Sequence, residues 1–209
     1  SIRSRNGGLM KMETQRTGFA AGRTKKMTIT GMLGAISVVL GFTPLGFIPI
    51  GLANVTTMHI PVIIGAIVEG PFVGAMVGLI FGISSLIKSF MTPTPISFIF
   101  MNPLVSVVPR VLIGILTYYF YTAMKKVVRN EKTVLLMSGA FGTLVNTVLV
   151  LGTAYLLYAQ RIVEAMSLPE GGAFAFFMGI ATTNGVPEMI VAAVVTAASV
   201  TAIKKIVKN

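Results

Sequence analysis

Residues 92–110, TPTPISFIFMNPLVSVVPR, join a proline-broken connection to the start of a long apolar segment. The connection carries Thr92 and Ser97, and the apolar run 103–124 has Arg110 as its single charged residue. Placing an arginine within a bilayer-length apolar segment costs about 2.5 to 3.5 kcal/mol, and more if the guanidinium is unpaired. A carboxylate, backbone carbonyls or an anionic ligand must offset that cost. We therefore interpret the rest of the chain as the wall of a cavity around this arginine.

The composition is that of an integral membrane protein. The 209 residues are 54% hydrophobic and 11% charged, whereas soluble domains carry about 25% charged residues. The absence of cysteine excludes disulfides, thiolate metal sites and a cysteine nucleophile. The sequence contains no Walker motif, paired catalytic carboxylates, metal-ligand cluster or Ser-His-Asp arrangement. We therefore expect a protein that is not an enzyme and has no cofactor or metal of its own.

The formal charge of +11 is concentrated at one side of the predicted membrane segments. Fourteen of the 17 basic residues fall in three groups, before, between and after the apolar runs: Arg3, Arg5, Lys11, Arg16, Arg23, Lys25 and Lys26; Lys125, Lys126, Arg129 and Lys132; Lys204, Lys205 and Lys208. Basic residues that flank apolar segments in this way are typical of the cytoplasmic side of a membrane. No face interleaves basic and aromatic residues, so we expect no nucleic-acid partner.

Apolar segments long enough for helices divide the chain into predicted spans. These are 27–45, 58–68, 72–89, 103–124, 133–158, and 189–203, the last preceded by an apolar stretch at 173–183. The prediction is an all-α integral membrane protein of six transmembrane helices with both termini cytoplasmic. Residues 27–209 form its single domain, and residues 1–26 are expected to be disordered or of recombinant origin.

Two of these segments leave alternatives open. Segment 58–68 is short for a span, since crossing takes about 20 residues, and it would have to be tilted, continued by the preceding loop or packed inside the bundle. Segment 173–183 is either re-entrant or interfacial, because NGVPE at 184–188 interrupts the pattern. Residues 46–57 are expected to form a Gly- and Pro-containing outer connection.

Small residues mark two helix faces. Gly74, Gly78 and Gly82 recur at four-residue spacing, which favours close packing against a neighbouring helix. Gly31 and Ala35, with Gly34 between them, form a second small-residue motif. This second motif has two interpretations, internal packing or docking of a separate membrane partner.

Polar residues gather at one depth. A rise of about 1.5 Å per residue places six polar side chains from four spans in the outer half of the membrane. They are His59, Asn102, Arg110, Asn146, Asn184 and Glu188, and the candidate site adds Asn54, Thr92 and Ser97 from the outer connections. The inner half is almost purely apolar, so we predict a pocket that opens to the outside.

Each member also has a purely structural interpretation. Arg110 could pair with Glu188, Asn146 could bond to a neighbouring backbone, Asn184 could cap a helix that begins near residue 187, and His59 could be a satisfied interfacial histidine. Taken together, prolines and glycines interrupt the backbone at the same depth, which a membrane tolerates where the backbone lines a cavity. A planar guanidinium fork suits a carboxylate, and the predicted ligand is a small polar carboxylate.

Four motifs resemble the substrate-binding S component of an energy-coupling factor (ECF) vitamin transporter. They are the small-residue motif Gly31 to Ala35, MHIPVIIGAIVEGPFVGA at 58–75, NPLVSVVPR at 102–110 and NGVPE at 184–188. The resemblance covers residues 27–209 and implies a multi-pass protein of the bacterial plasma membrane that captures a vitamin from outside. It also implies docking onto a coupling membrane protein with two cytoplasmic ATPases that use the ATP. The family's Ala-x-x-x-Ala docking motif is matched here with Gly31 in place of the first alanine.

Within that family the second and third motifs are most similar to the pantothenate-specific members. The resemblance leaves folate, riboflavin, lipoate and hydroxymethylpyrimidine as other possible vitamins. Folate would favour an aromatic stacking partner, although the chain has no tryptophan, and riboflavin does not explain a buried arginine. A self-sufficient secondary transporter would be expected to show inverted repeats, and a membrane enzyme would need inward-facing carboxylates or a metal site. Neither feature is visible.

Overall fold

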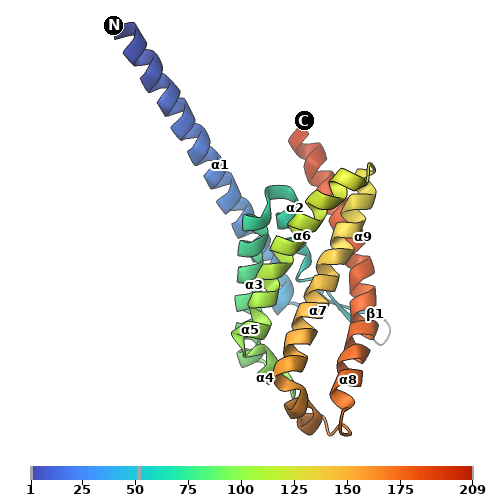
Figure 1. The fold of residues 1–209 in the computed structure, drawn as a ribbon. Helices are drawn as coiled ribbons and strands as arrows, with labels where there is room; N and C mark the ends of the chain where they lie inside the picture. The colour runs from blue at the N-terminus through green and yellow to red at the C-terminus, as the bar shows by residue number, and fades with distance from the viewer. Residues whose placement is uncertain (1, 51–52, 209) are drawn as a thin grey trace.

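A computed structural model describes the backbone of residues 2–50 and 53–208 and the side chains of residues 22–44, 46 and 56–206. Long helices run side by side in one bundle, and a small hairpin lies beside it (Figure 1). The elements are α1 (Ile2–Phe42), η1 (Pro44–Gly46), β1 (Phe47–Ile50), β2 (Ala53–Thr56), α2 (Ile60–Glu69), α3 (Pro71–Met91), α4 (Ser97–Phe100), α5 (Pro103–Ser106), α6 (Val108–Val127), α7 (Glu131–Ala165), α8 (Gly172–Ile180), η2 (Ala181–Gly185) and α9 (Val186–Lys208).

Most of these helices are long and apolar enough to cross a membrane. Among the residues whose side chains the structure describes, five helical stretches qualify, namely Gly22–Phe42, Pro71–Met91, Pro103–Val127, Glu131–Ala165 and Gly172–Ile206. The predicted helical membrane bundle is therefore confirmed. The count of six crossings and the cytoplasmic placement of both termini stay predictions. The domain boundary at residue 26 is also still a prediction, although α1 already begins at Ile2.

Helix α2 is the short segment for which the sequence left three arrangements open. It has 10 residues, and every residue from Ile60 to Ile67 is buried. At about 1.5 Å per residue it rises about 15 Å, roughly half the hydrocarbon thickness. The helix is surrounded by the bundle, so the structure favours the arrangement in which a short apolar segment is packed inside.

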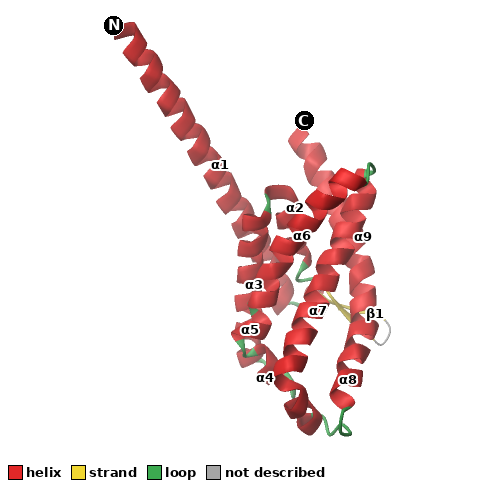
Figure 2. Ribbon diagram, viewed as in Figure 1, coloured by secondary structure: helices red, strands yellow, loops and turns green. Residues whose placement is uncertain are grey.

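The connection before α2 contains a β-hairpin that the sequence did not predict. Strands β1 and β2 pair antiparallel, with Phe47 opposite Thr56 and Ile50 opposite Ala53 (Figure 2). The strictly all-α prediction is wrong in this segment. Strand pairing satisfies backbone N–H and C=O groups that an irregular connection would leave exposed to the membrane.

Residues 172–208 form one continuous helical run, which corrects the predicted interruption at 184–188. Helix α8 continues through the π-helical turn η2 directly into α9. Pro187 has no N–H to donate to the preceding turn, and this missing bond gives a physical reason for the local change in helix geometry. Segment 173–183 is therefore the first part of the last long helical run, and not a separate re-entrant or interfacial helix.

The glycine ridge of α3 packs against α6, as predicted. A methyl group added at Gly78 would overlap the carbonyl oxygen of Arg110, and one at Gly74 would lie 2.6 Å from the Cβ of Ala66 on α2 and 3.0 Å from the Cα of Gly114 on α6. A methyl group added at Gly82 would lie 2.8 Å from the Cα of Val107, the residue before α6. The backbones of α3 and α6 are thus in direct contact. This contact determines the backbone position from which the Arg110 side chain extends.

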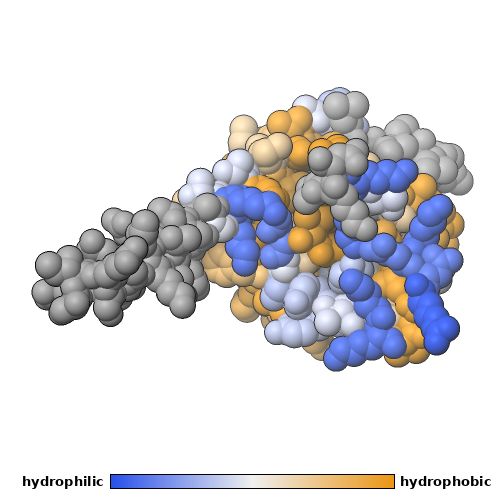
Figure 3. Space-filling view, turned by 90° about the horizontal axis from the view of Figure 1, so that it is seen from above, coloured by the Kyte–Doolittle hydropathy of each residue, from blue (hydrophilic) through white to orange (hydrophobic). Residues whose placement is uncertain are grey.

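The basic residues lie toward one end of the bundle. The beginning of α1, the α6–α7 connection and the end of α9 lie toward the same end, at the top of Figure 1. In the view onto this end, hydrophilic residues gather over the bundle and hydrophobic residues lie between and around them (Figure 3). The far end carries α4 and the α7–α8 connection. The grouping of charge at one side, expected from the sequence, is present in the fold.

Candidate functional site

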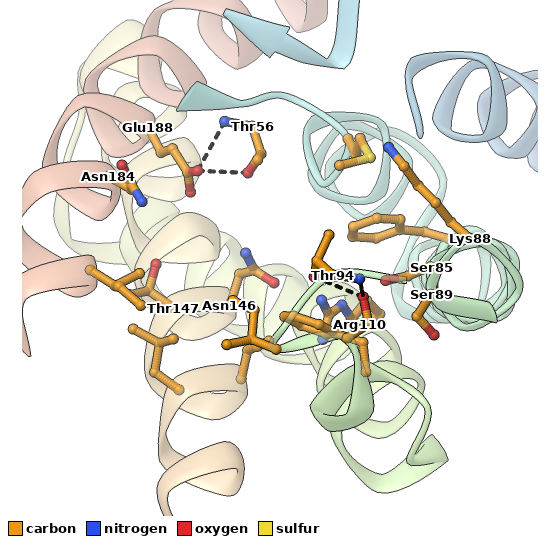
Figure 4. Close-up of a pocket in the computed structure, with 18 of the residues that line it drawn as sticks. Thr56, Ser85, Lys88, Ser89, Thr94, Arg110, Asn146, Thr147, Asn184 and Glu188 are labelled. Atoms are coloured by element: carbon orange, nitrogen blue, oxygen red, sulfur yellow. Dashed lines mark hydrogen bonds between the residues drawn. The ribbon is translucent and has the colours of Figure 1, made fainter. Parts of the chain in front are cut away.

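A cavity of about 470 Å³ lies between α3, α6, α7 and the η2–α9 junction. Its polar lining residues come from segments that are far apart in the sequence (Figure 4). They are Thr56, Ser85, Lys88, Ser89, Thr92, Thr94, Ser97, Arg110, Asn146, Thr147, Asn184 and Glu188. The volume is within the range of about 300–1,000 Å³ typical of sites for small molecules. Six of the nine predicted substrate-binding residues therefore line one cavity.

Arg110 is positioned by a backbone defect in the segment that carries it. In a continuous helix the N–H of residue 109 would donate to the carbonyl of Val105. Pro109 has no N–H, so this carbonyl is left without its helical partner. Nη1 of Arg110 donates to that carbonyl oxygen. The proline thus creates the acceptor that holds the guanidinium of the next residue.

Most of the guanidinium's hydrogen-bonding capacity is still available. The Arg110 side chain is 6% exposed, and its bond to Val105 is the only hydrogen bond it makes within the described part of the chain. Nε is buried and has no partner there. The rings of Phe81 and Phe100 lie 5.5 and 5.7 Å from the guanidinium carbon, so cation–π contacts stabilise the charge partially. A guanidinium has five N–H donors, and this one is poised for an additional acceptor.

Glu188 lies across the cavity from Arg110 (Figure 4). Its Oε1 accepts from the backbone N–H of Thr56 at 2.9 Å and from the Thr56 hydroxyl at 2.6 Å. Among the described residues no ion pair joins Glu188 to Arg110. The structural alternative in which these two residues neutralise each other is therefore not the arrangement found. Glu188 instead holds the end of β2 over the cavity.

Two amide side chains also face the cavity (Figure 4). Asn184 lies on the side of Glu188, and Asn146 lies between Glu188 and Arg110. Asn146 on α7 has its Oδ1 buried without a hydrogen-bond partner in the described structure. The sequence had left open that Asn146 bonds to a neighbouring backbone, but this oxygen makes no such bond in the described structure. Asn184 lies in η2, inside a continuous helical run, and does not cap α9. Both amides line the cavity and can donate or accept.

The connection from Thr92 to Ser97 forms part of the cavity wall. The Ser97 hydroxyl oxygen accepts from the backbone N–H of Thr94 at 2.7 Å and lies 2.8 Å from the Thr94 hydroxyl. The Thr92 hydroxyl donates to the carbonyl of Lys88 at 3.0 Å. These local bonds give the proline-broken connection a defined shape, with both predicted residues lining the cavity.

Several lining residues were not predicted, and Lys88 is the most important of them. Its ammonium donates to the backbone carbonyl of Gly41 at the end of α1, and its side chain reaches the cavity from the α3 side (Figure 4). The available signal was a single lysine near the outer end of an otherwise apolar segment. Thr56, Ser85, Ser89, Thr94 and Thr147 gave no comparable signal, because small hydroxyl residues occur throughout membrane helices.

Residues 25–200 match the family model described as "ECF transporter, substrate-specific component". The chain belongs to this family. It is thus a transport component and a multi-pass protein of the bacterial plasma membrane, and the resemblance found from the sequence motifs is confirmed.

Two relatives in this family carry pantothenate in their names. "Pantothenic acid transporter PanT" of Lactococcus lactis subsp. cremoris is 33% identical over 168 residues, which cover 74% of this chain and 80% of the relative. "Pantothenate transporter PanT" of Leuconostoc mesenteroides subsp. mesenteroides is 29% identical over 188 residues, which cover 84% of this chain and 90% of the relative. The predicted similarity to the pantothenate-specific members is confirmed at this level.

Two residues predicted for the site of this ECF component, His59 and Asn102, are not among the cavity's lining residues, and a third lies outside the described side chains. His59 is 1% exposed, and its Nε2 lies 2.9 Å from the hydroxyl of Thr143 on α7. The side chain of Asn102 accepts from the N–H of Leu104 at 2.9 Å and donates to the hydroxyl of Tyr158 at 3.0 Å. Asn54 belongs to β2, and its side chain lies outside the described part of the structure. His59 and Asn102 thus bond to other residues of the protein, and their role in the described structure is to hold those segments in place.

The small residues of α1 divide between the two interpretations left open. A methyl group added at Gly34 would lie 2.5 Å from the side chain of Ile80, so Gly34 packs against α3. Gly31 has no atom within 4 Å of an added methyl group, and Ala35 is exposed. Gly34 therefore serves internal packing, while Gly31 and Ala35 form an outward-facing surface on the bundle.

The titratable side chains of the described part of the chain are scattered. Among residues 22–44, 46 and 56–206, no three His, Cys, Asp or Glu side chains are grouped closely enough to hold an ion. The site's chemistry is that of two cationic side chains, one carboxylate, two amides and several hydroxyls. These groups can bind a small polar ligand that carries a carboxylate.

Proposed function

We propose that this chain is the S component that captures pantothenate from the outside for an ECF importer. The observation that carries the proposal is Arg110, a buried guanidinium with unused donors facing a cavity of about 470 Å³. Family membership and the names of the two relatives support the same ligand. Pantothenate combines one carboxylate, one amide and two hydroxyls, and the cavity offers partners for each.

In this proposal the carboxylate binds at the α3–α6 side of the cavity. The fork of Arg110 accommodates two carboxylate oxygens, and the ammonium of Lys88 adds a second positive charge to the same side. Ligand binding then provides the anion that a buried arginine requires, which offsets part of its insertion cost of about 2.5 to 3.5 kcal/mol. The carboxylate is the end of the ligand that contributes most to affinity.

The amide and hydroxyl groups of the ligand face the opposite wall. Asn146 and Asn184 provide amide groups that pair with an amide or a hydroxyl. The carboxylate of Glu188 accepts from hydroxyl donors with the oxygen that Thr56 does not engage. This arrangement orients the ligand along the line from Arg110 to Glu188.

We further propose six crossings with both termini cytoplasmic. The basic end of the bundle then faces the cytoplasm, in agreement with the positive-inside rule, and the cavity lies toward the outside. Gly31 and Ala35 present small side chains on α1, and such surfaces allow another membrane helix to approach closely. A coupling membrane protein docks there, two cytoplasmic ATPases supply the energy from ATP, and toppling of this chain in the membrane releases the vitamin inward.

Calorimetric titration of the purified protein in detergent tests the ligand. We expect binding of pantothenate and none of pantothenol, in which an alcohol replaces the carboxylate. Folate, riboflavin, lipoate and hydroxymethylpyrimidine are the comparison ligands. Binding of one of these in place of pantothenate would keep the family and overturn the substrate.

The first variant to measure is Arg110→Gln. Loss of charge-assisted hydrogen bonds of about 1.5–3 kcal/mol predicts an affinity for pantothenate about 10- to 100-fold weaker. Lys126→Gln is the matched control, because Lys126 is exposed at the basic end and loses the same charge. Equal pantothenate affinity in wild type and Arg110→Gln, with both folded by circular dichroism, would contradict the proposed role of the guanidinium.

A further inference from the structure

A second concave surface lies between α7 and α9, at the basic end of the bundle. This groove has a volume of about 390 Å³, and we name it the α7–α9 groove. Its lining residues are Lys132, Leu136, Ala197, Ala198, Thr201, Ala202 and Lys205. The two lysines lie at the ends of their helices nearest to the basic end, and the apolar residues continue toward the membrane interior.

The groove exists because the two helices are close at one point and carry small residues beyond it. A methyl group added at Gly139 on α7 would lie 2.7 Å from the carbonyl oxygen of Ala192 on α9. Lys132 precedes Gly139 by about two turns. In this interval α9 presents three alanines, which leave the space between the helices unfilled.

The two lysines of the groove make no ion pair within the described structure. Lys132 and Lys205 are both exposed, and neither makes a side-chain hydrogen bond there. Lys205 also lines a neighbouring pocket that contains Glu69 and Glu131, but these two carboxylates are paired with Lys25 and Lys204. The groove therefore combines an apolar floor with a positively charged rim.

We propose that the α7–α9 groove binds an anionic phospholipid. The phosphate of the headgroup contacts Lys132 and Lys205, and one acyl chain lies along Leu136 and the alanines. The chain belongs to a family of membrane proteins, so these helices are surrounded by lipid, and basic pockets between transmembrane helices are a recurrent type of anionic-lipid site. The charge of the rim selects the headgroup, while the apolar floor distinguishes a lipid from free phosphate.

Native mass spectrometry of the full chain, released from detergent micelles, tests the proposal. Phosphatidylglycerol and phosphatidylcholine with identical acyl chains are added separately, and the fraction of protein with one bound lipid is measured. We expect one phosphatidylglycerol to be retained preferentially. The double variant Lys132→Gln with Lys205→Gln is expected to weaken this binding about 30-fold, from about 1 kcal/mol per basic residue near the membrane surface.

Two further variants separate the groove from general electrostatic attraction. Lys126→Gln with Arg129→Gln removes the same charge from exposed positions outside the groove and is expected to retain the lipid. Ala198→Phe fills the groove without changing any charge and is expected to lose it. Inorganic phosphate and glycerophosphate at the same concentration are expected not to compete.

Three results would overturn the proposal. Equal losses in the two double variants would mean that the lipid responds only to the overall charge of this end. Equal retention of phosphatidylcholine and phosphatidylglycerol would exclude headgroup recognition and leave the groove to an uncharged chain or a partner helix. Retention by Ala198→Phe, with its fold unchanged by circular dichroism, would place the lipid elsewhere.

Discussion

The two walls of the cavity are held in place by different interactions. On the α3–α6 wall the position of Arg110 is determined by direct backbone contact, since the space next to Gly78 is filled by the Arg110 carbonyl. On the η2–α9 wall Glu188 is positioned by two hydrogen bonds with Thr56. A backbone contact can only be relieved by moving a helix, whereas side-chain hydrogen bonds can be exchanged for bonds to a ligand. The cationic wall is therefore expected to be the rigid one.

The largest effect is expected from Gly78→Ala, which attacks the rigid wall. The added methyl group cannot be placed without moving α6 away from α3, and overpacking of this kind costs about 3 kcal/mol, at the upper end of its usual range. We expect a lower melting temperature by circular dichroism and loss of pantothenate binding. Gly152→Ala on α7 is the control, because nothing lies within 4 Å of its added methyl group. Equal melting temperatures for the two variants would show that the α3–α6 contact is adaptable.

A smaller effect is expected from Glu188, which tests the hydrogen-bonded wall. Glu188→Ala leaves the N–H and hydroxyl of Thr56 without their acceptor, at a cost of about 1–3 kcal/mol. Glu188→Gln keeps an acceptor oxygen and is expected to retain more of the pantothenate affinity in calorimetric titration. Equal losses in the alanine and glutamine variants would mean that the negative charge matters, and not the bonds to Thr56.

The smallest effect is expected from Pro109→Ala, which refines the account of Arg110. The new N–H can donate to the carbonyl of Val105 and compete with the guanidinium for it. We expect unchanged or slightly higher thermal stability and a change in pantothenate affinity of less than about tenfold, the equivalent of one ordinary hydrogen bond. Pro61→Ala in α2 is the control, since Pro61 also lies at the start of its helix but the carbonyl four residues before it, that of Thr57, accepts from the N–H of Ile60 and not from an arginine. Identical affinities in both variants would contradict the role given to Pro109.

Position along the axis of the helix bundle could be derived from the sequence alone. Each residue of a helix adds about 1.5 Å, so counting from the ends of the apolar segments placed Arg110, Asn146, Asn184 and Glu188 in one zone. All four line the cavity. The glycine ridge of α3 and the basic end were equally accessible, because spacing and charge grouping are properties of the sequence itself.

The direction in which a side chain points around its helix required the tertiary structure. His59 bonds to Thr143 on α7 and does not line the cavity. Gly34 faces α3, whereas Gly31, only three residues earlier, faces open space. Lys88 and Thr56 reach the cavity only because α3 and the β-hairpin are placed beside it. Helix rise is a local property of the backbone, whereas these directions depend on which helices are neighbours. The sequence by itself therefore determined the membrane class, the family and the level of the site, and packing between distant segments decided which residues form its walls.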